Sequence, residues 1–182
     1  MTDHKTLQMQ HANRRLEGRE FLEPVLSMSE YCTVALHDDP YPYIVPMNMG
    51  YEWDETGLRL YLHMAVKGHR IDLINRDPHV CVNVCTFLDR FGYKPYRNEG
   101  HDYRSITVFG TARILEPKDE EEFLHGLNVL AVQHGRAPVK KIVPDFERRL
   151  RILEVTAEQI TGKAQYPITE VEDLPIPPNT ER

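Results

Sequence analysis

Apolar and polar residues follow the period of two that a β-strand requires along several stretches of this chain. Turn-forming clusters rich in Pro, Gly, Asp and Asn separate these stretches. The clusters at 38–42 and 54–57 are short enough to join their flanking strands as antiparallel hairpins. In total the pattern predicts six strands, at residues 31–37, 43–53, 58–64, 80–87, 103–115 and 150–156.

Helical spacing of apolar residues occurs before, between and after these strands. It predicts helices at residues 20–28, 69–76 and 117–134, and a short helix after Asp145. Because hairpins dominate and helices are insertions, without strict alternation of strand and helix, an antiparallel barrel is favoured over a parallel doubly wound sheet. The expected fold is mainly β (α+β), with a few peripheral helices.

The strand at 43–53 carries two residues that weaken a sheet. Proline cannot donate a hydrogen bond to a neighbouring strand, and glycine has no side chain to pack. Pro46 and Gly50 therefore indicate either a bulge or the close approach of another group to the backbone, and a flat ligand is one candidate for that group. An edge strand with a twist is the alternative interpretation.

The composition is that of a globular protein. With 182 residues, 41% hydrophobic and 27% charged, the chain is long enough for one soluble domain with a sizeable core. We expect an N-terminal extension at residues 1–18, one compact domain at 19–165 and a proline-rich tail at 166–182.

The charge balance restricts the partners. The chain has 22 Lys and Arg residues against 28 Asp and Glu, a formal charge of −6, which disfavours nucleic acid and anionic membrane as partners. No apolar run approaches the roughly 18 residues that a membrane-spanning helix needs. The first residues also lack the hydrophobic region of a signal peptide, so we expect a cytoplasmic protein.

Three cysteines leave an odd thiol, so no disulfide framework is implied and a reducing compartment is indicated. Two of them, Cys81 and Cys85, share one face of the 80–87 strand, whose nearly continuous apolar pattern predicts burial on both faces. They are predicted to be core cysteines, because no second Cys/His pair stands at the spacing of a zinc site. We predict no metal site.

The strongest chemical signal is the segment at 61–72, where an apolar strand runs into a glycine and three basic side chains at the start of a helix. Gly68 lets the backbone approach an anion closely, and the first N–H groups of the helix lack intrahelical partners. Lys67 and Arg70 add positive charge, and His69 is a titratable third group. The segment predicts a phosphate site, with a solvated basic loop as the alternative.

The anion segment and the Pro46–Gly50 stretch belong to neighbouring strands of one predicted hairpin. Both features can therefore serve one ligand. Such a ligand would have a planar end beside the weakened strand and an anionic end beside the basic turn.

Four segments in order, at residues 41–47, 61–70, 103–112 and 160–163, together resemble the pyridoxamine 5'-phosphate oxidase-like flavoproteins, and most of all their 5-nitroimidazole-resistance (nitroimidazole reductase) branch. The resemblance extends from about Tyr31 to Lys163. It implies a six-stranded antiparallel split β-barrel that forms a homodimer and holds FMN between its two subunits.

The resemblance also implies roles for individual residues. The strand from Val45 to Asn48 would lie along the isoalloxazine ring, and the segment from His63 to Arg70 would contact the ribityl chain and phosphate. Arg104 and Ser105 would approach the cofactor from the following strand or from the partner subunit. The cofactor-binding residues implied in this way are Val45, Pro46, Met47, Asn48, His63, Met64, Ala65, Lys67, Gly68, His69, Arg70, Arg104 and Ser105.

The activity that the resemblance implies is an FMN-dependent oxidoreductase. It would take electrons from a reduced nicotinamide or another donor and reduce a small electron-poor compound, such as a nitroaromatic. His63 matches the histidine of the Tyr-x-His-x-Ala segment in the nitroimidazole-resistance branch, so it is the candidate catalytic residue, with a structural histidine at a strand end as the alternative. Typical pyridoxamine phosphate oxidases share a basic C-terminal signature that contains tryptophan. The only tryptophan here is Trp53, so that activity is not expected.

Two other hypotheses remain open. A non-enzymatic flavin- or haem-binding protein, acting as a store, sensor or carrier, is the first, since related split barrels bind haem and scattered histidines offer axial ligands. A deazaflavin reductase is the second, although its longer anionic cofactor calls for more basic residues than the matching segments contain. The loop at 92–101 is a candidate lid over the flavin.

Overall fold

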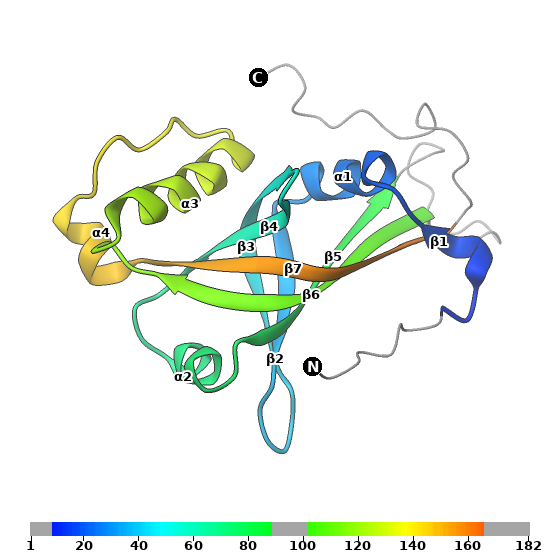
Figure 1. Ribbon diagram of the computed structural model, residues 1–182, viewed down its shortest axis with the longest axis horizontal. Helices are drawn as coiled ribbons and strands as arrows, with labels where there is room; N and C mark the ends of the chain where they lie inside the picture. The colour runs from blue at the N-terminus through cyan, green and yellow to red at the C-terminus, as the bar shows by residue number, and fades with distance from the viewer. Residues whose placement is uncertain (1–8, 89–101, 166–182) are drawn as a thin grey trace.

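The computed structural model describes residues 9–88 and 102–165, and the strands of this part form one antiparallel sheet that closes on itself (Figure 1). The strand order is β1-β7-β4-β3-β2-β5-β6, and a further pairing of β6 with β7 closes β2 to β7 into a six-stranded barrel. This confirms the expected antiparallel barrel. The strands are β1 Arg15–Leu16, β2 Tyr31–Leu36, β3 Tyr43–Asp54, β4 Gly57–Met64, β5 His79–Leu88, β6 Asp102–Leu115 and β7 Arg151–Ala164.

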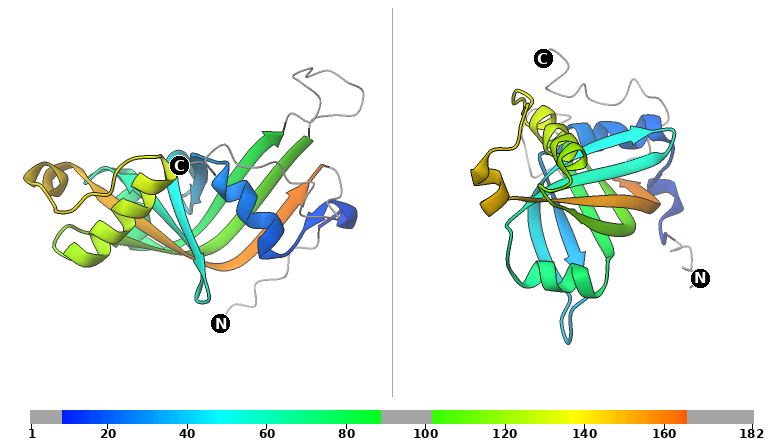
Figure 2. Two further views of the ribbon diagram at one scale, coloured as in Figure 1. Left: turned by 90° about the horizontal axis from the view of Figure 1, so that it is seen from above. Right: turned by 60° about the vertical axis from the view of Figure 1, so that its left-hand side comes forward.

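Helices lie around the barrel and do not enter its interior. Figure 2 shows α3 and α4 toward one end of the molecule, with the start of the described chain toward the other. α2 follows β4 and lies below the barrel in Figure 1. The helices are η1 Ala12–Arg14, α1 Arg19–Ser27, α2 His69–Arg76, α3 Glu120–Gln133 and α4 Pro144–Arg149.

The barrel interior is filled by alternate residues of each strand, as the period of two requires. On β6, for example, Ile106 and Val108 are fully buried, whereas Ser105 and Thr107 are only partly covered on the outer face. The inward side chains of the strands merge into a single large apolar cluster, which α1 extends with Val25. Burial of this kind contributes roughly 25 cal/mol per Å² of apolar surface, so the cluster is the main source of stability.

β5 departs from the sequence prediction. The expected burial of both faces is wrong, because Asn83 and Cys85 are exposed while Val82 and Val84 between them are buried. Cys85 is therefore not a core cysteine, although Cys81 is half-covered. A nearly continuous run of apolar residues does not show whether a strand is buried on one face or on both, because cysteine is found on buried and on exposed faces.

β7 is longer than predicted. The strand was expected to end at Thr156, but it continues to Ala164 because β6 pairs with it along its whole length. The two strands accommodate a register shift between Phe109 and Gly110, where the chain bulges. Hydrogen bonding to a long neighbour thus extends the strand through a segment in which the apolar alternation is weak.

α3 packs directly on the outer faces of β3 and β4. A Cβ atom on Gly50 would lie 2.8 Å from the carbonyl oxygen of Val129, and one on Gly126 would lie 2.8 Å from Cδ1 of Tyr61. The group that approaches Gly50 closely is therefore the backbone of a helix rather than a flat ligand. The register of β3 with both neighbours is regular, so the bulge interpretation is wrong.

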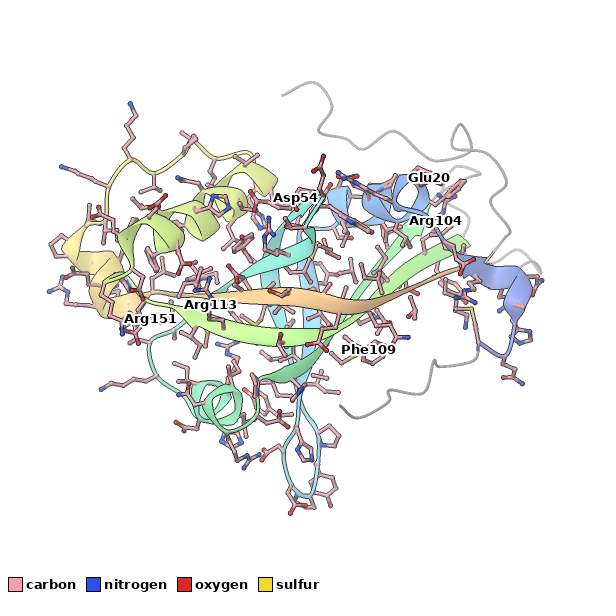
Figure 3. The ribbon with its side chains drawn as sticks, viewed as in Figure 1. Glu20, Asp54, Arg104, Phe109, Arg113 and Arg151 are labelled. Atoms are coloured by element: carbon pink, nitrogen blue, oxygen red, sulfur yellow. The ribbon has the colours of Figure 1, made fainter. Side chains whose placement is uncertain are left out.

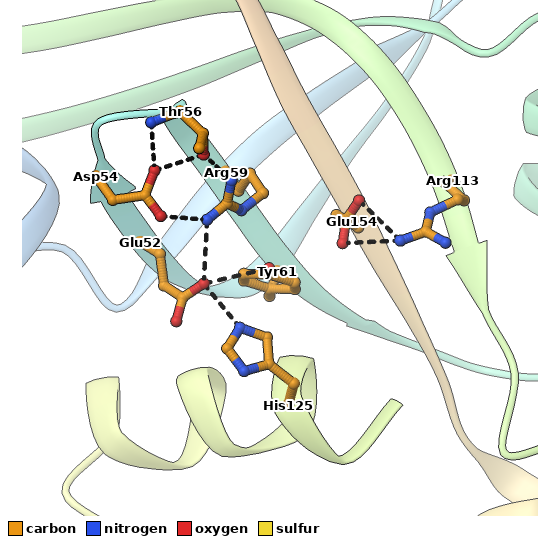
Figure 4. Close-up of polar contacts among 8 residues, drawn as sticks. All are labelled: Glu52, Asp54, Thr56, Arg59, Tyr61, Arg113, His125 and Glu154. Carbon is orange, nitrogen blue, oxygen red and sulfur yellow. Dashed lines mark hydrogen bonds and ion pairs between the residues drawn. The ribbon is translucent and has the colours of Figure 1, made fainter. Parts of the chain in front are cut away.

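Polar contacts add to this packing (Figure 4). On the α3 side, Glu52 accepts a hydrogen bond from Tyr61 at 3.3 Å and lies 2.8 Å from Nε2 of His125. At the hairpin tip, Arg59 contacts Asp54 at 2.6 Å. The hydroxyl and N–H groups of Thr56, followed by Arg59, lower the pKa of Asp54 to about 2. These contacts orient the hairpin, but they are largely exposed and stabilise it only modestly.

Residues 15–16 of the expected N-terminal extension pair with β7, and Leu16 is buried. Residues 1–8, the candidate lid at 92–101 and the tail at 166–182 lie outside the described residues.

Among the described helices, none is long and apolar enough to cross a membrane.

The close approach of α3 yields a stability prediction. Gly50→Ala should lower the free energy of unfolding by about 1–3 kcal/mol, because the added methyl group meets helix backbone that cannot rotate away. Asn48→Ala is the matched control on the same face of β3; its side chain is exposed, so its effect should stay within about 0.5 kcal/mol. Urea denaturation measures both variants. Equal stability of Gly50→Ala and the wild type would contradict the packing described.

Candidate functional site

The two halves of β3 pair with different strands. Residues 43–48 pair with β2, whereas residues 49–54 pair with β4. On the β4 side, the 43–48 half has no partner strand among the described residues. A half-paired segment tolerates a residue that cannot donate, which accounts for Pro46 within a long strand. The open side also leaves backbone polar groups available to a ligand.

A cavity of about 420 Å³ lies beside this half-paired segment. This volume is within the range of small-molecule sites, roughly 300–1,000 Å³. Four elements, β2, β3, the end of β4 with the turn after it, and the first turn of α2, supply its walls. The lining residues are Tyr31, Pro46, Met47, Asn48, His63, Met64, Ala65 and Arg70.

All but one of these lining residues belong to the set implied by the sequence resemblance. The exception is Tyr31, which pairs with Asn48 across β2 and β3 and is 65% exposed. Sequence reasoning missed it because the register of β2 against β3 decides which residue stands opposite Asn48. The residues of the implied set that do not line the cavity are Val45, Lys67, Gly68, His69, Arg104 and Ser105.

The side chains at the cavity face two directions. Asn48 and His63 are exposed on the outer face, so they present polar groups to the cavity. Met47 and Met64 are only 4% and 1% exposed and belong to the core cluster, so they lie beneath the cavity. Val45 is packed against the same core cluster. Because alternate residues of a strand face opposite sides, some of the implied residues form the polar surface of the cavity and others belong to the apolar core beneath it.

One end of the cavity is basic. Gly68 precedes α2 with φ of 135°, a conformation that glycine adopts readily, and no side chain caps the helix. Arg70 lies in the first turn, and its Nε atom is buried without a hydrogen-bond partner among the described residues. A cationic side chain beside uncapped helix N–H groups is suited to bind an anion.

The two basic residues next to Gly68, Lys67 and His69, do not line the cavity as Arg70 does. His69 points away from the cavity: its Nε2 lies 2.6 Å from Oδ2 of Asp38, and its ring contacts Tyr43 edge-on. This contact lowers the pKa of Asp38 and ties α2 to the β2–β3 connection. Lys67 is exposed and forms no ion pair within the described part of the chain. Successive residues of a helix point about 100° apart, so Arg70 can face the cavity while His69 faces Asp38.

Arg104 and Ser105 lie on β6, away from the cavity lining. Arg104 is fully buried and shares the inward face of β6 with Ile106. Figure 3 shows it at the α1 end of the barrel. Ser105 lies on the outer face opposite Cys85. Their approach to a cofactor bound by a partner subunit stays a prediction.

His63 has the clearest electrostatic environment of the site. Partial desolvation of the ring by the surrounding protein, and then the positive charges of Arg70 and Arg136, lower the pKa of its imidazole from the ordinary value of 6.5. The ring is therefore neutral at pH 7 and can both donate and accept a hydrogen bond. The imidazole of His63 makes no hydrogen bond to any described residue, whereas the backbone of His63 pairs with β7. Its catalytic role and the alternative, a structural histidine at a strand end, both stay predictions.

The described residues contain no cluster of three or more His, Cys, Asp and Glu side chains that could hold a metal ion. The site instead combines a half-paired strand, a neutral histidine and a basic helix start, all on the outer face of an antiparallel barrel. This arrangement defines a split-barrel protein with a site for a small molecule.

The chain belongs to the pyridoxamine 5'-phosphate oxidase family, whose family model matches residues 19–164. The family that the four sequence segments resemble is thereby confirmed. No curated protein matches the chain.

Several solved structures have the same fold. A candidate 5-nitroimidazole antibiotic resistance protein from Bacteroides thetaiotaomicron is 25% identical, with a TM-score of 0.62 over 82% of this chain and 86% of that one. An FAD-binding protein from Mesorhizobium loti is 21% identical, with a TM-score of 0.54 over 83% and 96%. An FAD and haem binding protein from Mycobacterium smegmatis is 18% identical, with a TM-score of 0.60 over 88% and 78%. At the last two identities the likeness concerns the fold alone.

The environment of His63 can be tested directly. Arg70→Ala should raise the pKa of His63, because it removes a positive charge that disfavours the imidazolium. Arg76→Ala is the matched control on the same helix, since Arg76 bonds the carbonyl of His37 and not the cavity. NMR titration of the imidazole signals measures both. A His63 pKa that moves equally in the two variants would refute the assigned electrostatic effect of Arg70.

Proposed function

We propose that the cavity beside β3 binds FMN and that the protein is an FMN-dependent oxidoreductase. The observation that carries the proposal is the lining of the cavity: residues implied by the family motifs, from two strands and a helix start, surround one space. Family membership supports it, as do relatives described as an FAD-binding protein and an FAD and haem binding protein.

The residues present fit such a cofactor. The flat ring would lie against the half-paired backbone from Pro46 to Asn48, where no strand competes for the polar groups. The phosphate would lie at the start of α2, where Arg70 Nε lacks a protein partner and Lys67 adds an unpaired charge. A bound flavin would supply the electron transfer, and the protein would supply position and electrostatics.

A small electron-poor compound, such as a nitroaromatic, is the proposed substrate. The structural relative described as a candidate 5-nitroimidazole antibiotic resistance protein supports this choice. His63 lines the same cavity as a neutral imidazole, so it can hydrogen-bond a substrate placed over the ring, and its proposed role is that of a catalytic residue. A reduced nicotinamide is the proposed electron donor.

A homodimer with the flavin between its subunits is part of the proposal. Two large apolar side chains are exposed on the outer face of β2 and β3, Tyr31 at 65% and Ile44 at 62%. Tyr31 also lines the cavity, so a second subunit on this face would cover both the apolar surface and the ligand.

The alternative, a non-enzymatic flavin or haem carrier, has weaker support. Among the described candidates for an axial ligand, His69 contacts Asp38, and His37 lies 3.6 Å from a carboxylate oxygen of Asp77. His63 is then the histidine left facing the cavity. His101 lies outside the described residues.

The first test is cofactor binding. Purified protein titrated with FMN should show saturable binding and a two-band flavin spectrum, whereas a Soret band would favour haem. Lys67→Ala and Arg70→Ala should each weaken FMN binding by about 1.5–3 kcal/mol, roughly 10- to 150-fold, because each loses a charge-assisted contact with the phosphate.

Arg76→Ala, on the same helix but bonded to His37 and Asp38, is the control and should bind FMN normally. Absence of any FMN binding would refute the proposed function. Unchanged affinity in both Lys67→Ala and Arg70→Ala would move the phosphate to another place. A bound flavin that no donor reduces would favour the carrier over the enzyme.

The second test concerns the dimer. Ile44→Glu should weaken self-association at least about tenfold, because burying an isoleucine contributes about 1.5–3 kcal/mol and the new charge opposes burial. Val132→Glu is the control, since Val132 is also exposed, at 66%, but lies on α3. Light scattering after size-exclusion chromatography measures the mass of each variant. A monomeric wild type, or equal effects of the two substitutions, would contradict this interface.

A further inference from the structure

The cavity continues a strip of sheet that α3 covers. On β3, Gly50 and Glu52 lie under α3, and the next residue on the same face, Asn48, lines the cavity. On β4, Tyr61 lies under α3, and the next residue on that face, His63, lines the cavity. Alternate residues of a strand share a face, so α3 covers the part of this face that lies directly next to the cavity.

The C-terminal end of α3 is fixed near this edge. The side-chain amide of Gln133 donates to the carbonyl of Ser29 at 3.0 Å and to that of Leu26 at 3.2 Å. Ser29 is two residues before Tyr31, which lines the cavity. Gly135 then reverses the chain with φ of 63°, and the N–H of Arg136 donates to Ala131 at 2.7 Å. Residues 134–136, the α3 corner, are thus held beside the site.

Arg136 differs from most arginines outside the site. Arg19, Arg59 and Arg113 each contact a carboxylate. Arg136 is exposed and contacts no carboxylate among the described residues. Its positive charge nevertheless reaches His63, whose pKa it lowers together with Arg70. Arg136 does not itself line the cavity, so its unpaired guanidinium is available to the part of a ligand that extends from the cavity toward the α3 corner.

We propose that Arg136 binds the anionic group, a carboxylate or a phosphate, of the second ligand that enters the site beside the cofactor. The proposal rests on the proposed function, in which α2 holds the cofactor phosphate. It divides the positive charge near the cavity between two places: Lys67 and Arg70 on the α2 side serve the cofactor, and Arg136 at the α3 corner selects the substrate or electron donor.

This division follows from electrostatics. The whole chain carries a formal charge of −6, so an anionic ligand is repelled over most of the surface and attracted only where cations lack partners. Guanidinium groups bind carboxylate and phosphate through two parallel hydrogen bonds, which specify the orientation of the ligand as well as its charge. A cation on the α3 corner therefore orients a flat acid over the half-paired part of β3.

The test uses two probes of the same shape, benzoate and its neutral analogue benzamide. Their binding is followed by the NMR signals of the His63 ring, in cofactor-free protein and in protein loaded with FMN. Benzoate should bind Arg136→Ala about tenfold more weakly than the wild type, Arg136→Lys should recover part of the loss, and benzamide should bind all three alike. NADP+, titrated in the same way, distinguishes a nucleotide phosphate from a carboxylate as the natural anion.

Lys140→Ala is the matched control, because Lys140 is an exposed cation on the same connection between α3 and α4. It should leave benzoate binding unchanged. Equal losses for benzoate and benzamide, a loss in Lys140→Ala as large as in Arg136→Ala, or anion binding by neither benzoate nor NADP+ would overturn the proposal.

The readout does not depend on the cofactor. If FMN fails to bind but Arg136→Ala still weakens benzoate selectively, the proposed function fails and the anion site stands. If FMN binds normally and benzoate is insensitive to Arg136, the anion site fails and the proposed function stands.

Discussion

The site depends on how β3 is paired, with its first half on β2 and its second half on β4. Because β4 pairs only with the second half of this strand, the first half keeps one side of its backbone open. The covered half supports α3 through Gly50, while the open half borders the cavity at Asn48. A fully paired strand would stabilise the barrel more, but it would leave no backbone for a flat ligand.

One helix lines the cavity beside that open strand, and a second helix packs on the neighbouring part of the same sheet face. α2 begins with an uncapped turn and presents Arg70, while His69 on the same turn is tied to Asp38. α3 packs closely on β3 at Gly50 and on Tyr61 through its own Gly126, and it is followed by the α3 corner with Arg136. Desolvation and the charges of Arg70 and Arg136 lower the pKa of His63, so its imidazole is neutral at pH 7, which is the protonation state suited to hydrogen-bond an uncharged group.

Much of this could be predicted from the sequence, and the failures have physical causes. Strand alternation and turn chemistry depend on neighbouring residues, so the barrel and the basic turn at Gly68 were predictable. The outer face of β5 was not, because Cys85 is compatible with either burial or exposure. Likewise Gly50 indicated close approach, but only packing identifies the approaching group as α3.

By itself the sequence determined the class of fold, the family and most of the residues that line the cavity, because these depend on local periodicity and on short motifs. The tertiary structure alone decided which of them face one another. Register brings Tyr31 to Asn48, helix rotation turns His69 away while Arg70 faces the cavity, and a distant turn brings Arg136 toward His63. Contacts between residues far apart in the chain depend on the packing of whole elements, which no local pattern encodes.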